Sequence, residues 1–194
     1  MAEGGRRSVL FLGRLHPSEG LVPLLKAAAM LADRFPDLHL VLAGEVDPVW
    51  RNVLQAAIRR QGFEDRACII PSPSSEEVPK LLREADLLIQ PSPGPCCPVS
   101  ALQAMAFGRP VVVTPGCNLA EVQTVGAGWV VESKRTALQN ALSEAFSSSP
   151  AELQARGRRA VELVRQRYDW DRLGHEYLNL YARMTVQGGP TARA

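Results

Sequence analysis

The sequence predicts an α/β fold, a single three-layer domain in which helices cover both faces of a parallel, doubly wound sheet. Three observations lead to this prediction. Short apolar runs alternate with longer segments of helical periodicity along most of the chain. Loops rich in Gly and Pro separate the two kinds of segment. The length of 194 residues suits one sizeable core better than two domains.

The strands and helices are expected to alternate along the chain, except that no helix is predicted between the last two strands and three helices follow the last strand. The predicted strands are short apolar runs, namely Ser8–Leu12, Leu38–Ala43, Cys68–Ile70, Leu87–Gln90, Val111–Val113 and Gly128–Val131. The predicted helices are Leu21–Phe35, Pro48–Gln61, Ser75–Glu84, the segment from Pro98 to Gly108, Lys134–Ser147, Pro150–Arg167 and Asp171–Met184. Such alternation is typical of a parallel sheet whose connections cross over as helices.

The most informative stretch runs from Ala85 to Val113 and combines strand, loop, helix, turn and strand. Pro91–Cys97 is too rich in Pro and Gly to be anything but a loop. Pro98 suits the first position of a helix, where its missing N–H has no partner to lose. Gly108 is placed to end that helix. Apolar residues recur at helical spacing between them, at Val99, Leu102, Met105 and Ala106.

A loop that leads into a helix at the carboxyl end of a parallel strand offers free N–H groups and the positive end of the helix dipole. The stretch therefore predicts a phosphate site, with a plain crossover that binds no ligand as the alternative. Two more loops are expected at the same edge, Gly13–Gly20 and Gly44–Pro48. Gly13 allows close backbone approach to a ligand, and Arg14 has a fork of donors suited to phosphate, although a plain surface arginine is the alternative.

Composition excludes several classes of partner. The 22 Lys and Arg against 20 Asp and Glu give no electrostatic case for nucleic acid. No apolar run approaches the ~20 residues that span a bilayer, and no signal peptide is visible, so we expect no transmembrane segment and a cytoplasmic protein. The cysteines, Cys68, Cys96, Cys97 and Cys117, lack the spacing of a metal site or a disulfide framework. Reduced thiols are expected.

Five motifs in order carry a resemblance to a known family. They are Phe11-Leu-Gly-Arg-Leu-His-Pro-x-x-Gly20, Leu40-Val-Leu-Ala-Gly44, Ala85-Asp-x-x-x-x-Pro-Ser92, Ala104-Met-Ala-x-Gly-x-Pro-Val-Val112 and Glu121. Together they resemble the C-terminal, donor-binding domain of family 4 retaining glycosyltransferases of the GT-B fold. The resemblance implies a Rossmann-like domain that binds a nucleotide-diphosphate sugar for retaining transfer to an alcohol acceptor. It implies no cofactor and no metal, and it implies an N-terminal acceptor domain or separate subunit as partner.

The resemblance also implies a division of the chain. Residues 1–7 form an N-terminal extension, 8–167 the donor-binding domain, 168–185 a helix that crosses back to brace the acceptor domain, and 186–194 a flexible tail. The aromatic residues Trp170 and Tyr181 of the crossing helix are the expected contacts, with ordinary core packing as their alternative role. Because half of the expected cleft is absent, we expect the isolated chain to be inactive.

Carried over by position, the donor site of the family falls on Gly13 and Arg14 for the diphosphate, Val99 and Ser100 at the helix N-terminus, and Gln103 for the ribose. A sugar-contacting loop falls on Pro95, Cys96 and Cys97. No catalytic residue and no metal ligand is assigned.

This sequence departs from the family at several of these positions. Glu19 stands where the family has a lysine, and Pro95 and Gln103 stand where it has a pair of glutamates. Glu45 or Asp47 is a candidate replacement acid, although Asp47 equally suits the N-cap of the helix that begins at Pro48. Two functions stay open: a divergent transferase, or a catalytically degenerate nucleotide-binding or scaffold module that pairs with another subunit. A flavodoxin-like or response-regulator domain fits the alternation but not the motifs.

Overall fold

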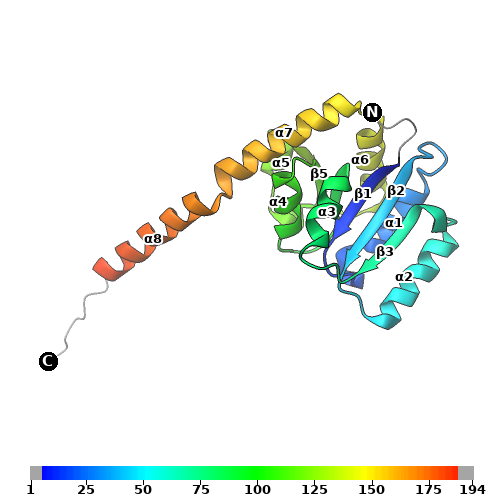
Figure 1. Ribbon diagram of the computed structural model, residues 1–194, viewed down its shortest axis with the longest axis horizontal. Helices are drawn as coiled ribbons and strands as arrows, with labels where there is room; N and C mark the ends of the chain where they lie inside the picture. Colours follow the sequence, from blue (N-terminus) through cyan, green and yellow to red (C-terminus); the bar gives the residue numbers. More distant parts are fainter. Residues whose placement is uncertain (1–5, 188–194) are drawn as a thin grey trace.

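A computed structural model describes residues 6–187, and these form a three-layer α/β arrangement around one parallel sheet (Figure 1). The strands lie in the order β3-β2-β1-β4-β5-β6. Their bounds are Arg7–Leu12 for β1, Leu38–Gly44 for β2, Ala67–Pro71 for β3, Leu87–Gln90 for β4, Val111–Val113 for β5 and Gly128–Val130 for β6. All neighbouring strands pair in parallel. The predicted doubly wound α/β fold is confirmed.

The helices follow the strands in chain order and divide between the two faces. They are α1 Leu21–Ala29, α2 Pro48–Arg60, α3 Glu77–Glu84, α4 Val99–Ala106, α5 Glu121–Thr124, α6 Arg135–Ser147, α7 Pro150–Arg167 and α8 Trp170–Gln187. Buried residues of α1, α2 and α6 share one apolar cluster with the sheet, and those of α3, α4, α5 and α7 share the other. The chain crosses from β3 at one edge back to β4 beside β1, so strand order reverses between β1 and β4. In such sheets the crevice for ligands opens at that point, at the carboxyl ends of the strands.

The six predicted strands are present with ends that differ by at most one residue, but several helix ends differ from prediction, that of the first helix by the most. The first helix stops at Ala29 rather than Phe35, because Leu31 and Ala32 donate to the carbonyls three residues earlier and the α-helical ladder is lost. Pro98 is the N-cap of α4 rather than its first residue. The four-residue helix α5 was not predicted.

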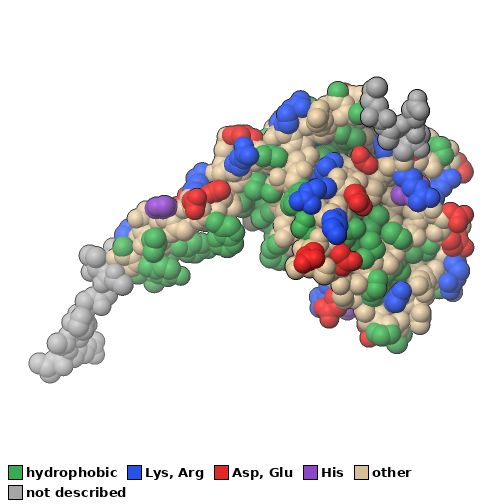
Figure 2. All heavy atoms as spheres, in the orientation of Figure 1, with side chains coloured by type: hydrophobic (Ala, Val, Ile, Leu, Met, Phe, Trp, Pro, Cys, Tyr) green, Lys and Arg blue, Asp and Glu red, His purple; other side chains and the backbone are tan. Residues whose placement is uncertain are grey.

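The far end of the chain departs from the rest of the molecule. Helix α8 projects away from the sheet, and Figure 2 shows hydrophobic side chains gathered along one side of it. Trp170 is 83% exposed and Tyr181 59%, so their alternative role as core residues is wrong. β1 begins at Arg7, the last residue of the expected extension. Residues 1–5 and 188–194, which hold most of that extension and of the expected flexible tail, lie outside the described residues.

Candidate functional site

The loops that follow β1 and β2 are joined by their backbones at the carboxyl edge of the sheet. The Gly13 N–H donates to the carbonyl of Ala43 at 3.0 Å, and the Leu15 N–H donates to that of Glu45 at 2.7 Å. Gly44 has a φ of 150°, and a Cβ added to it would lie 1.8 Å from the Gly13 carbonyl oxygen. Only glycine fits this close approach. The first two loops therefore form one surface.

The loop after β1 is also joined to the loop after β4. Gly20 has a φ of 74°, and a Cβ there would lie 2.2 Å from the Pro91 carbonyl oxygen. The Ser92 hydroxyl donates a hydrogen bond to the Glu19 carboxylate, and the buried Thr114 hydroxyl donates to the Ser92 carbonyl. These contacts join two loops that are far apart in sequence, since Glu19 and Ser92 are separated by 73 residues.

Two cavities open between these loops. The first, which we call the Arg14 cavity, has a volume of about 560 Å³. It is lined by the end of β4 and by the first and third loops, with residues that include Arg14, Glu19, Gln90, Ser92, Pro95, Cys96 and Cys97. The second, which we call the Gln103 cavity, has a volume of about 720 Å³ and is lined by residues that include Gly44, Glu45, Ser72 and Gln103. Gly13 and Ser100 line both. The two cavities therefore meet at the first turn of α4.

The N-terminus of α4 is the place where a phosphate site is predicted. Its N-cap residue, Pro98, makes no side-chain hydrogen bond to the first N–H groups of the helix. Those groups and the positive end of the helix dipole remain available to an anion. Ser100 lines both cavities, whereas the Val99 side chain is 52% exposed and lines neither, so any role of Val99 is confined to its backbone.

Charge in the Arg14 cavity is mixed. Arg14 is exposed and makes no hydrogen bond or ion pair with the other residues of the described range 6–187. Glu19 is half-buried, and Ser92 holds its carboxylate in the same cavity. The cavity is therefore lined by one cation and one anion, Arg14 and Glu19. An interaction of a phosphate with each of these charges is worth on the order of 1–4 kcal/mol at partly exposed positions.

The cysteine loop packs against the turn that follows β5. The Sγ atoms of Cys96 and Cys117 lie 3.0 Å apart, and all the cysteines are free thiols. Burial is the main cause, and the neighbouring Cys117 thiol the second, that raises the pKa of Cys96 to about 12. Cys96 is therefore a neutral thiol at physiological pH. Gly116 allows the contact, since a Cβ there would lie 2.1 Å from the Gly94 carbonyl oxygen. No group of three or more metal-ligating side chains lies together among residues 6–187.

The two candidate acids of the second loop have different roles. The Asp47 carboxylate accepts hydrogen bonds from the N–H groups of Val49 and Trp50, so Asp47 is the N-cap of α2. Glu45 lines the Gln103 cavity. Of the two, only Glu45 lines the cavity that also contains Gln103.

Sequence reasoning missed two residues of the Arg14 cavity, Gln90 and Ser92. Both are buried, Gln90 at 6% exposure and Ser92 at 4%, and both line the cavity. The Oε1 atom of Gln90 is buried and accepts no hydrogen bond from the described residues. The available signal was a polar residue at the end of the apolar run Leu87–Ile89.

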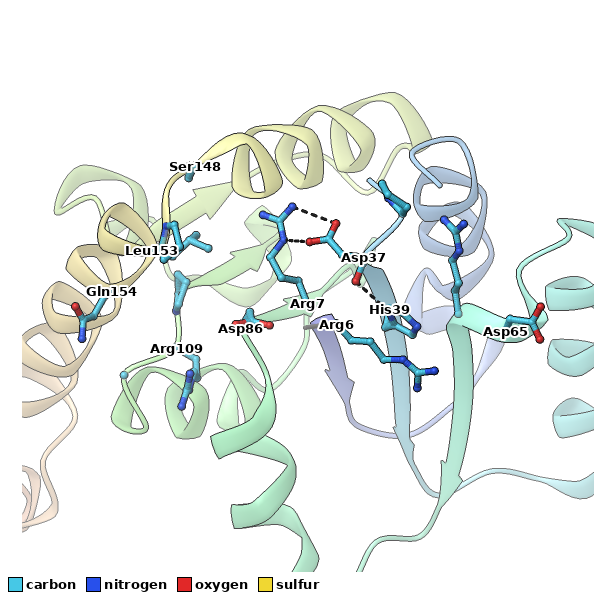
Figure 3. A pocket seen from close by; sticks show the side chains of 15 residues that line it. Arg6, Arg7, Asp37, His39, Asp65, Asp86, Arg109, Ser148, Leu153 and Gln154 are labelled. Atoms are coloured by element: carbon cyan, nitrogen blue, oxygen red, sulfur yellow. Dashed lines mark hydrogen bonds and ion pairs between the residues drawn. The ribbon is translucent and has the colours of Figure 1, made fainter. Parts of the chain in front are cut away.

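A larger basin of about 970 Å³ lies at the opposite end of the sheet, where the strands begin (Figure 3). Most of its charged groups bind one another or the backbone, whereas the side chains of Arg6 and Asp65 make no hydrogen bond or ion pair with the described residues 6–187. Arg7 points at Asp37, donates to its carboxylate at 3.2 Å and to the Phe146 carbonyl at 2.7 Å, and lowers the pKa of Asp37. The Asp86 carboxylate accepts from the Ser8 N–H at 2.8 Å. We therefore assign these groups to the fold.

Comparison with known proteins agrees with this geometry. The sequence model described as "Glycosyl transferases group 1" matches residues 2–162, so the chain belongs to this family of glycosyltransferases. A D-inositol 3-phosphate glycosyltransferase from Arthrobacter sp. (strain FB24) is 31% identical over 91% of this chain and 42% of its own length. A GDP-mannose:cellobiosyl-diphosphopolyprenol alpha-mannosyltransferase from Komagataeibacter xylinus is 26% identical over 96% of this chain and 48% of its own.

Solved structures share the GT-B Rossmann-like fold. Sucrose-phosphate synthase from Thermosynechococcus elongatus has a TM-score of 0.85 and 22% identity, over 96% of this chain and 47% of that one. Alr3699/HepE from Anabaena, solved with UDP and glucose, has a TM-score of 0.81 and 21% identity over 92% and 48%. The C-terminal domain of a group 1 glycosyl transferase (LpcC) from Francisella tularensis matches at 0.77 and 22% over 86% and 88%. The chain thus spans about half the length of its longer relatives. Within residues 6–187, no helix is long and apolar enough to cross a membrane.

Proposed function

We propose that this chain is the donor-binding half of a family 4 retaining glycosyltransferase and that it binds a nucleotide-diphosphate sugar across its two adjoining cavities. The observation that carries the proposal is the meeting of both cavities at the uncapped N-terminus of α4, with Arg14 beside them. Relatives at 26% and 31% identity are named as glycosyltransferases, and a structural neighbour holds UDP and glucose.

In this proposal the diphosphate lies at the shared wall of the cavities, against the N–H groups of Val99 and Ser100. Gly13 allows its close approach, and Arg14 stabilises the negative charge that develops on the leaving phosphate. The nucleoside extends into the Gln103 cavity, where Gln103 binds a ribose hydroxyl. The sugar lies in the Arg14 cavity near the loop of Pro95, Cys96 and Cys97. No metal is needed, because helix dipole and arginine supply the positive charge.

Titration of the chain with uridine and guanosine diphosphates tests donor binding. A ligand at about one hundred times its Kd stabilises the folded state by about 2.7 kcal/mol. For a chain of this size each kcal/mol raises the Tm by about 2–4 °C, so a shift of about 5–11 °C is expected. No shift with either nucleotide at millimolar concentration contradicts the proposal.

A matched pair of variants assigns the phosphate contact. Arg14→Ala removes a cation beside the proposed diphosphate and should weaken nucleotide binding about tenfold or more, as loss of a charge-assisted hydrogen bond does. Arg51→Ala, at an exposed arginine of α2 that lines neither cavity, is the control and should leave binding unchanged. Equal affinities for both variants would remove Arg14 from the site.

The acceptor half is the proposed partner of α8. The exposed apolar residues of α8 are Trp170, Tyr177, Leu178, Leu180, Tyr181 and Met184. A face of this size is typical of a binding surface. Reading the native gene upstream of the Met1 codon tests this: an encoded acceptor domain, or an adjacent gene for one, is expected. A dimer in solution that Trp170→Ser dissociates would point to a second copy instead. With both halves on the cytoplasmic side, the reaction would use cytoplasmic nucleotide-sugars.

A second candidate function is a degenerate module that binds nucleotide without transfer. Pro95, which offers no polar side chain to the sugar, and Glu19, which places a negative charge in the cavity, favour it. Adding the acceptor half to the chain separates the two candidates. Release of nucleoside diphosphate that requires an acceptor alcohol supports the transferase, and nucleotide binding with no release supports the module.

A further inference from the structure

Gln90 is a buried amide with one polar atom left unpaired. The side chain is 6% exposed, and its Oε1 atom accepts no hydrogen bond from residues 6–187. Strand alternation puts it on the same face of the sheet as Leu88, and its register partner on β5 is Val113. Both neighbours are buried and apolar. The cavity is therefore the one polar space that the amide borders within the described part of the chain.

A buried amide oxygen without a partner destabilises the fold, and native proteins rarely keep one without a reason. A hydroxyl of a bound ligand is a suitable partner. A half-turn of the amide exchanges Oε1 and Nε2, and a hydroxyl both donates and accepts, so the pair forms in either orientation.

Glu19 lines the same cavity. The Ser92 hydroxyl donates to its carboxylate, and Thr114 fixes the Ser92 backbone in turn. This network orients a group that only accepts hydrogen bonds when ionised. Sugar hydroxyls are donors to it, whereas a second carboxylate on the ligand would be repelled.

We propose that the Arg14 cavity is the sugar subsite and that Gln90 and Glu19 select an uncharged sugar, Gln90 by binding a hydroxyl and Glu19 by rejecting a uronic acid. The proposal rests on the proposed function, because it needs the nucleotide in the neighbouring Gln103 cavity. In this proposal Gln90 contacts the substrate. Glu19 acts on the sugar and not on the phosphate.

The test compares nucleotides with and without their sugar on the whole chain. Binding of UDP, UDP-glucose and UDP-glucuronate, and of GDP and GDP-mannose, is measured by calorimetry for the native chain, Gln90→Met and Glu19→Gln. Methionine keeps the length of the glutamine side chain and removes its polar atoms. Gln90→Met should leave the Kd of each diphosphate within about twofold and weaken the better-bound neutral sugar nucleotide about tenfold, as loss of one buried hydrogen bond does. Glu19→Gln should improve UDP-glucuronate relative to UDP-glucose about tenfold.

Each result that differs from the expected one contradicts a different claim. If neither UDP nor GDP binds the native chain, the proposed function fails and the sugar subsite fails with it. If the nucleotides bind but Gln90→Met changes the diphosphate and the sugar nucleotide equally, or changes neither, the assignment of Gln90 is wrong while the proposed function stands. If Glu19→Gln leaves the ratio of the Kd values for UDP-glucuronate and UDP-glucose unchanged, Glu19 does not select the sugar.

Discussion

The unpaired amide of Gln90 predicts a gain of stability when it is removed. Gln90→Met replaces a buried polar group by an apolar one of similar length, in contact with the apolar cluster that includes Leu88 and Val113. A buried acceptor without a partner costs about 1–3 kcal/mol. At about 2–4 °C per kcal/mol for a chain of this size, the Tm of the ligand-free variant should rise by about 2–12 °C.

Thermal unfolding followed by circular dichroism measures the shift, with Gln61→Met as the matched control. Gln61 is exposed and ends α2, so its replacement should change stability by less than about 0.5 kcal/mol. A purely structural role for the Gln90 amide requires the opposite sign, because the variant would lose a contact that stabilises the fold. A lower Tm for Gln90→Met than for Gln61→Met would therefore refute the reasoning.

The remaining predictions concern the loops around the Arg14 cavity. Glu19→Lys replaces an anion by a cation in the Arg14 cavity, which adjoins the proposed diphosphate, and should tighten UDP binding at least about tenfold by calorimetry; unchanged or weaker binding contradicts it. Because the pKa of Cys96 is raised to about 12, iodoacetamide at pH 8 should modify the exposed Cys97 well before Cys96, and the rate at Cys96 should still rise beyond pH 10 by peptide mass spectrometry. Gly20→Ala should lower the Tm more than Gly62→Ala, because both have positive φ but only Gly20 lies against Pro91; equal losses would show that the contact is unimportant.

Local chemistry was enough to predict most of the fold. Apolar runs bounded by Gly and Pro gave the strands, and Asp47 followed by Pro48 gave the start of α2. Where prediction was wrong, the deciding interaction was not local in sequence or not periodic. The first helix was expected to reach Phe35 because Leu31 and Phe35 continue the apolar pattern, and both are indeed buried, but through turns rather than helix. Here the apolar periodicity predicts which residues are buried, but it does not predict where the α-helical hydrogen bonds end.

The candidate site was predictable in outline and not in its charges. The position of the Gln103 cavity followed from the motifs, because glycine backbones and a helix N-terminus determine it. The orientation of Glu19 depends on a hydrogen bond from Ser92, which no local pattern reveals. Gln90 was read as the end of a strand, and only the three-dimensional structure shows that its amide borders a cavity.

The distribution of departures from the family bears on whether the site is decayed or rebuilt. Glu19 and Pro95 both line the Arg14 cavity, and Gln103 lines the second cavity, where the glycine contact between Gly13 and Gly44 is intact. A decayed cavity would be free to replace Gln90 by an apolar residue, and the fold would gain stability from the change. The chain instead keeps a buried unpaired amide opposite a carboxylate held by Ser92. Polar groups held against the stability of the fold are typical of a functional site. This favours the proposed donor site over a decayed one.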